Sequence, residues 1–290
     1  MLKEQAENII ASARRAGVIP CAGLALLASV FLLDDRACAQ ANFHADYVIS
    51  FARIAVGNVS LTADIGSAGY EMSATGRVGG AMRLLANGEA HLTARGITAG
   101  ARLTPTNFAS KINSAGDPLD VTMAIENGNV SELTASPPVD DAAALSGENH
   151  KGILDPLSAL LIPADGIDDG LTACQRTLPI FDGRQRYDLQ LAFKRFDKVT
   201  ANTGYAGPVV VCSVRYHPIA GQWTSAPLVK YLAESREIEG AFAPVAGTRF
   251  LVPVRLLVTN LLANLLVQAN RFEVATQRQT PSNSSPNSPR

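Results

Sequence analysis

Residues that could carry out chemistry concentrate in one stretch of twenty, CQRTLPIFDGRQRYDLQLAF, which runs from Cys174 to Phe193. A thiol, two carboxylates, three guanidinium groups and a phenol lie close together in it, as they would in an active site. The stretch also fits a β-hairpin, because apolar side chains alternate on both sides of Asp182-Gly183, a preferred turn pair. We favour the hairpin, and predict that the residues on its opposite face point to solvent or to the rim of the sheet: Arg184, Arg186, Asp188 and Gln190.

The first residues of the chain have the order of a secretory signal peptide. Arg14 and Arg15 precede an apolar run, residues 16–33, and Ala37-Cys38-Ala39 is a small-x-small cleavage site. Residues 1–39 are therefore predicted to be a signal peptide, and the mature protein to lie in the periplasm. The alternative is an uncleaved inner-membrane anchor facing the periplasm, because 18 apolar residues are near the lower limit of about 17 for a membrane-spanning helix.

Cleavage would leave two of the four cysteines, Cys174 and Cys212. An exported chain with two cysteines is most simply interpreted as having one disulfide. The pair would join the start of the hairpin described above to a strand that follows it. A free reactive thiol is the alternative, and it would need an environment that lowers its pKa.

Patterns typical of cofactor and metal sites are absent from the sequence. No two glycines are two positions apart, no Gly-Lys pair exists for a phosphate loop, and no serine lies midway between glycines four apart. The aspartates of PADGIDDG lack the order of a calcium loop. We predict no cofactor, no metal and no catalytic residue, since the histidines are also too far apart to pair as zinc ligands: His44, His91, His150 and His217.

Alternation of apolar and polar residues dominates the rest of the chain and predicts antiparallel strands. Asn127-Gly128 is the preferred pair for a type I′ turn between two such strands. One short helix is predicted at ILDPLSALLI, with Asp155 as N-cap and Pro156 in the first helical position. The apolar run from Leu256 to Val267 is predicted to be a hairpin that turns near Asn260 and is buried on both faces, with an amphipathic helix as the alternative.

The expected fold is therefore mainly β: a curved antiparallel sheet, forming a half-barrel or open barrel, with one short helix. We expect a single β-rich domain over 43–276, after the N-terminal signal helix and before a disordered tail, 277–290, that is almost devoid of apolar residues. The net charge of −1 does not favour nucleic acid as a partner. Contact with a membrane is expected only through an uncleaved N-terminal segment.

Four blocks of the sequence together resemble a known family. They are GILDPLSALL (Gly152 to Leu161), LPIFDGRQRYDL (Leu178 to Leu189), VVCSVRYHPIAG (Val210 to Gly221) and PVAGTRFLVPVRL (Pro244 to Leu256). These resemble the bacterial exported-protein family called domain of unknown function 3108, and the likeness extends over most of Tyr47 to Phe272. The resemblance implies a signal-bearing protein of Gram-negative envelopes with a curved, largely antiparallel sheet, and it implies no catalytic residues.

Three functions fit these observations. The first is non-enzymatic binding of a lipid or another hydrophobic molecule in the concave face of the sheet. The second is a structural or assembly role, in which exposed sheet edges pair with another envelope protein. The third is an enzyme acting on cell-wall or polysaccharide substrates, which would require carboxylates to come together in space.

Overall fold

The computed structural model describes residues 40–277 apart from 81–87, 115–116, 140–145, 201–203, 222–226, 236 and 262. The predicted signal peptide and the predicted tail from residue 278 lie outside the described residues. Gln277, which the sequence placed in that tail, is the last residue of a strand. Among the described residues, no helix is long and apolar enough to span a membrane.

Fourteen antiparallel strands form one sheet, which begins at β7 and ends at β9 without closing into a ring. The strands neighbour one another in the order β7-β6-β5-β4-β3-β2-β1-β14-β13-β12-β11-β10-β9, and β8 pairs with β13 beside this path. The first half comprises β1 (Gln40–Phe51), β2 (Ile54–Ile65), β3 (Tyr70–Val78), β4 (Gly88–Ala99), β5 (Arg102–Ser114), β6 (Asp117–Glu126) and β7 (Asn129–Ser136). The second half comprises β8 (Ile162–Pro163), β9 (Arg176–Phe181), β10 (Gln185–Val199), β11 (Gly207–Gly221), β12 (Glu237–Pro244), β13 (Phe250–Thr259) and β14 (Leu265–Gln277).

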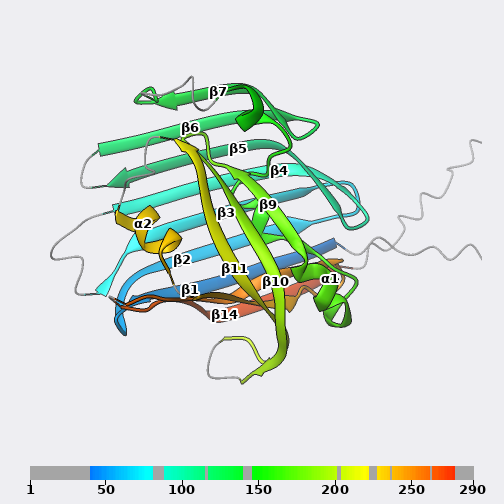
Figure 1. Cartoon of the computed structure of the whole chain (residues 1–290). Coiled ribbons are helices and arrows are strands. Elements are labelled where there is room, and N and C mark those ends of the chain that lie inside the picture. Colours follow the sequence, from blue (N-terminus) through cyan, green and yellow to red (C-terminus); the bar gives the residue numbers. More distant parts are fainter. Residues whose placement is uncertain are drawn as a thin grey trace, which may run out of the picture. The chain divides into compact units, whose positions relative to one another are not determined.

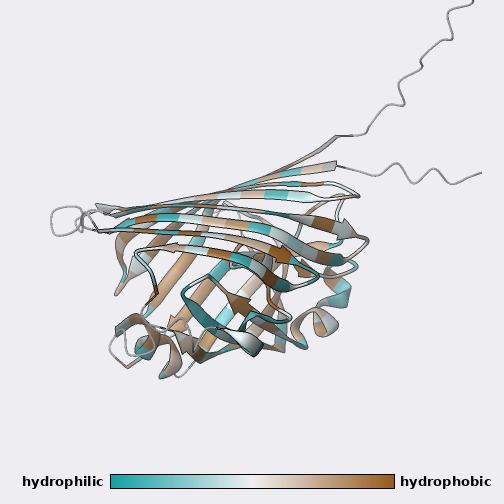
Figure 2. Cartoon of the chain, turned by 90° about the horizontal axis from the view of Figure 1, so that it is seen from above, coloured by the Kyte–Doolittle hydropathy of each residue, from teal (hydrophilic) through white to brown (hydrophobic). Residues whose placement is uncertain are grey.

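The sheet curves back on itself, so that β9, β10 and β11 cross over the strands β1 to β6 (Figure 1). Seen from above, the broad sheet of the first half faces the strands of the second half (Figure 2). The predicted fold class, an open and curved antiparallel sheet, is confirmed. Two short α-helices accompany it, α1 (Gly170–Cys174) and α2 (Pro227–Ala233), and the sequence had indicated neither.

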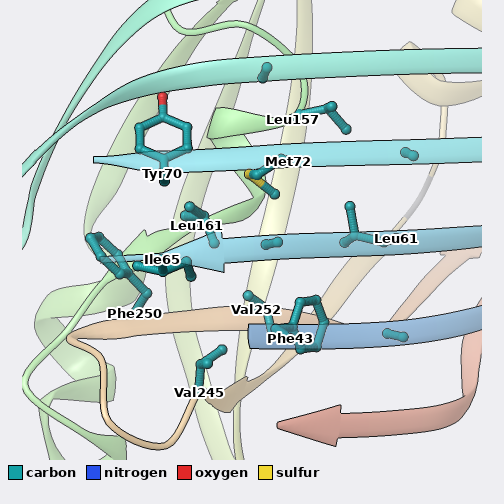
Figure 3. Packing of buried hydrophobic residues seen from close by; sticks show 14 of the residues in the cluster. Phe43, Leu61, Ile65, Tyr70, Met72, Leu157, Leu161, Val245, Phe250 and Val252 are labelled. Carbon is teal, nitrogen blue, oxygen red and sulfur yellow. The ribbon is translucent and has the colours of Figure 1, made fainter. Parts of the chain in front are cut away.

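The space between the two halves is filled by apolar side chains. Phe43, Leu61 and Met72 point inward from β1, β2 and β3 and are at most 2% exposed. They meet Leu157 and Leu161, which belong to the segment between η2 (Gly147–His150) and β8 (Figure 3). The middle of the concave face is therefore a packed core.

The segment that fills this core contains the predicted helix, and the prediction was wrong about its form. Only one turn of 3₁₀ helix is present, η3 (Ser158–Leu160). Leu154 makes a bridge to Ile180, and Ile162 pairs with Leu251 of β13. Both ends of the segment are therefore extended, which leaves room between them for a single turn.

Two tight turns have positive φ at both central residues, and only one of them has typical turn residues. At Asn127-Gly128, between β6 and β7, both residues have positive φ (52° and 78°), as the predicted turn requires. The β1–β2 turn is at Ala52-Arg53, which also has positive φ at both positions (49° and 68°). Neither alanine nor arginine is typical of such a turn, so the residue types did not indicate it.

The hairpin predicted near Asn260 is formed by β13 and β14, with the turn at residues 260–264. Its predicted burial on both faces was wrong. Val258 is fully buried, but Leu256, Leu265 and Val267 are only half-buried. This end of the sheet thus leaves apolar surface incompletely covered.

Candidate functional site

The Asp182-Gly183 turn, at the centre of the stretch from Cys174 to Phe193, packs against β6. Gly183 has φ 90°, and a Cβ added there would lie 2.3 Å from Cγ1 of Val121 in β6. The Asp182 carboxylate accepts hydrogen bonds from the backbone N–H groups of Arg184 (2.8 Å) and Gln185 (2.6 Å), and burial raises its pKa. The tip of the β9–β10 hairpin is therefore seated against β6.

Arg184 corrects the expectation that the charges of this stretch face solvent. It is 4% exposed, and its guanidinium donates a hydrogen bond to the backbone carbonyl of Pro137 (2.8 Å), directly after β7. Arg186 is also largely covered and pairs with Asp188 (2.5 Å), whereas Gln190 is exposed as expected. Arg184 joins the two ends of the open sheet, so its role is structural.

Asp155, Ser158 and Tyr70 form a second polar cluster inside the core. The hydroxyl of Tyr70 lies 2.6 Å from Oγ of Ser158, which donates a hydrogen bond to the Asp155 carboxylate. That carboxylate also accepts the backbone N–H groups of Leu157 (3.0 Å) and Ser158 (2.9 Å). The turn η3 begins at Ser158 with Leu157 as its N-cap, so Asp155, predicted as N-cap, and Pro156, predicted in the first helical position, both lie before it.

Burial raises the pKa of Asp155 to about 6 and raises that of Tyr70 above its ordinary range. Asp155 and Ser158 are completely buried, so this cluster ties the core segment to β3. The predicted disulfide is also present: Cys174 at the end of α1 is bonded to Cys212 of β11, with 5.5 Å between their Cα atoms.

Among the residues that the structure describes, no three His, Cys, Asp or Glu side chains are grouped to hold a metal ion. Glu237 and Glu239 both accept hydrogen bonds from Lys194, and Glu239 is paired with Arg195 as well, which lowers its pKa to about 2. A general acid for glycoside hydrolysis needs a raised pKa, so Glu239 has the opposite electrostatic environment.

A cleft with a mixed polar and apolar lining lies where β11 and β12 separate. β11 pairs with β10 as far as Gly221, but it pairs with β12 only from Val210 to Ser213. Beyond Ser213, helix α2 lies beside the free side of β11 (Figure 1). A cleft of about 740 Å³ remains there, lined by Gln190, Ala192, Ser213, Val214, Arg215, Tyr216, His217, Leu232, Ala233, Ser235, Glu237 and Ile238. We call it the α2 cleft.

Apolar side chains form one part of the α2 cleft and continue beneath the helix. Val229 of α2 is buried against Tyr216, Ile238 and Val258. This small cluster is surrounded by apolar residues that are only partly buried: Tyr187, Leu189, Val214, Tyr231, Leu232, Leu256 and Leu265. The incomplete cover distinguishes this cluster from the closed core between the sheet halves.

Helix α2 is attached to the β13–β14 turn. The hydroxyl of Tyr231 donates a hydrogen bond to the carbonyl of Ala263 (2.7 Å), and Nδ2 of Asn260 donates one to the carbonyl of Tyr231 (3.0 Å). Pro227 begins the helix, a position where its missing N–H costs no intrahelical hydrogen bond. The sequence did not indicate this helix, because seven residues are too few for a clear helical period.

Polar side chains form the rest of the cleft lining. Arg215 and His217 are exposed, and neither has a hydrogen-bond or ion-pair partner among the described residues. Glu237, by contrast, is held by Lys194. Arg215 is thus an uncompensated cation beside an apolar floor.

Comparison with known proteins places the chain in a family. The profile of the family described as "Protein of unknown function (DUF3108)" matches residues 46–260. The chain belongs to this family. The DUF3108 match contains the α2 cleft and the Asp155 and Arg184 clusters, and it ends just before β14.

Two further comparisons accompany the DUF3108 match. None of the curated proteins matches the chain. Among solved structures, a beta-barrel-like protein of domain of unknown function DUF1849 from Brucella abortus is similar, with a TM-score of 0.44 and 8% sequence identity. That alignment covers 81% of this chain and 98% of the other chain.

Proposed function

We propose that this protein binds an amphipathic, lipid-like molecule in the α2 cleft and does so as an exported protein of the cell envelope. The proposal moves the expected ligand from the middle of the concave face, which is filled by the core segment, to the end of the sheet beneath α2. The observation that carries it is the juxtaposition of a partly covered apolar cluster with the unpaired cation of Arg215.

The size of the cleft supports this proposal. Small-molecule sites commonly enclose about 300–1,000 Å³ and combine apolar walls with a few polar groups that fix orientation. The α2 cleft has about 740 Å³ and both kinds of lining. A long-chain carboxylate or a monoacyl phospholipid would place its chain against Val214, Leu232 and Ile238 and its anionic head near Arg215.

Binding of a fluorescent long-chain fatty acid tests the proposal. Ala192→Phe places a ring in the cleft and should abolish binding, whereas Ala275→Phe, at an exposed alanine of β14 outside the cleft, should leave it unchanged. Arg215→Gln should weaken binding at least tenfold, because a charge-assisted hydrogen bond contributes about 1.5–3 kcal/mol. Arg102→Gln, an exposed arginine of β5, is its control.

Circular dichroism and thermal unfolding of each variant show that the fold is kept. Equal affinity of wild type, Ala192→Phe and Arg215→Gln would contradict the location of the site. A failure of the wild type to bind any long-chain anionic amphiphile would contradict the function.

An assembly role has one observation in its favour. β7 is a terminal strand of the sheet, and within the described part of the chain β6 is its one partner strand, so its other edge could pair with another chain. We propose this as the second candidate. Crosslinking from β7 with a photoreactive residue at the exposed Glu132 tests it, since a partner strand would be captured there and not from the cleft.

A further inference from the structure

Exposed apolar residues gather at the end of the sheet where α2 lies. Among the described residues, eight large apolar side chains are exposed, and four of them belong to this end. They are Phe51 (40% exposed), Ile54 (58%), Leu228 (60%) and Leu261 (76%). Half of the exposed large apolar side chains on the described surface thus come from three short segments: the β1–β2 turn, α2 and the β13–β14 turn.

These three segments are in direct contact. The backbone N–H of Ala52 donates a hydrogen bond to the carbonyl of Asn264 (3.0 Å), which joins the two turns. The ring of Phe51 lies 6.0 Å from that of Tyr231 of α2, whose hydroxyl is bonded to Ala263. Figure 1 shows α2 and the ends of β1 and β14 at the same end of the sheet. The four apolar residues therefore belong to one surface, which we call the apolar end.

Two cations belong to the apolar end. Residues 51–54, 227–233 and 260–264 contain Arg53 and Lys230, and the acidic residue next to them in the sequence is Glu234, directly after α2. Both cations are exposed, and neither has an ion-pair partner among the described residues. Arg53 occupies a left-handed turn position (φ 68°) that glycine or asparagine would adopt more easily, and strained positions of this kind concentrate at functional sites.

We propose that the apolar end docks on an anionic lipid surface. Phe51, Ile54 and Leu261 would enter the boundary between head groups and acyl chains, while Arg53 and Lys230 contact the anionic head groups. Projecting apolar side chains among unpaired cations are complementary to such a surface. Membrane docking does not depend on a ligand in the α2 cleft, although helix α2 contributes residues to both the apolar end and the cleft.

Vesicle sedimentation tests the proposal with the protein as its host produces it and with its N-terminus identified by mass spectrometry. Wild type should bind phosphatidylcholine vesicles containing phosphatidylglycerol. Ile54→Ser with Leu261→Ser should weaken that binding at least tenfold. Ile97→Ser with Phe196→Ser is the matched control, because these residues are also exposed large apolar side chains (53% each) and lie outside the apolar end.

Every variant keeps the same N-terminus, so residues 1–39 cannot produce a difference between them. Arg53→Gln with Lys230→Gln should remove the preference for vesicles containing phosphatidylglycerol over vesicles of phosphatidylcholine alone. Equal sedimentation of both double serine variants would overturn the proposal. It would also be overturned if wild type does not sediment with vesicles and instead forms a dimer that the Ile54→Ser, Leu261→Ser variant loses, because the occupant would then be a second copy. Fatty-acid binding should be measured on the same variants. It reports on the α2 cleft, so it distinguishes a failure of membrane docking from a failure of ligand binding in the cleft.

Discussion

Asp155 is a buried carboxylate surrounded by hydrogen-bond donors of its own turn and by no cation among the described residues. Desolvation raises its pKa to about 6 and outweighs the hydrogen bonds from Ser158 and Leu157, which lower it. A raised pKa in the folded state means that folding favours the protonated form. The contribution of Asp155 to stability is therefore fully present below pH ~4 and is lost as the pH rises through ~6.

Asp155→Asn should remove the loss of stability that wild type shows as the pH rises. The amide oxygen still accepts the two backbone N–H groups and the amide nitrogen donates to Ser158, so the turn is kept without a buried charge. Relative to wild type, the variant should gain up to about 3 kcal/mol of unfolding free energy between pH 4 and pH 7. Urea unfolding of both proteins at several pH values measures it.

Asp155→Ala is the matched control, because it removes the charge together with the cap. It should be destabilised at both pH values, since buried backbone N–H groups lose their acceptor. Parallel pH profiles for wild type and Asp155→Asn would show that the carboxylate does not titrate in this range.

At the scale of elements, the β9–β10 hairpin holds the two ends of the sheet together through its tip. Gly183→Ala should destabilise the protein by about 2–4 kcal/mol, because the new methyl meets Val121 and also occupies a positive φ. Gly128→Ala is the control: its φ is also positive, but its nearest neighbour is 3.8 Å away, so only about 1 kcal/mol of strain is expected. Thermal unfolding compares them, and equal losses would mean that the hairpin tip does not pack tightly on β6.

Elements with local chemical signals could be predicted from the sequence. Asn127, Gly128 and Gly183 are the turn residues that positive φ demands, and the predicted strands lie on both sides of each turn. The residue types of Ala52-Arg53 give no such signal. This turn is held by a contact distant in sequence, the hydrogen bond from the Ala52 N–H to the β13–β14 turn. The helix expected at Asp155 fails because pairing with Ile180 and β13 overrides a local helical preference.

At the scale of the whole molecule, the open curved sheet, the family and the Cys174–Cys212 pair followed from alternation, block resemblance and cysteine count. The α2 cleft did not, because it depends on how far β11 pairs with β12 and on a seven-residue helix beside the gap. The burial of Arg184 could not be predicted either, because it too depends on a contact distant in sequence. Its acceptor follows β7, 47 residues earlier in the chain, and a local alternation pattern contains no information about that contact.

Detection of a bound molecule is the most direct test of ligand binding in the α2 cleft. Native mass spectrometry with organic extraction should be applied to the protein purified from its own host, alongside Ala192→Phe. We predict that wild type carries one anionic amphiphile per chain and that Ala192→Phe has the mass of the protein alone. A ligand-free wild type, or a ligand retained equally by Ala192→Phe, would contradict the assignment.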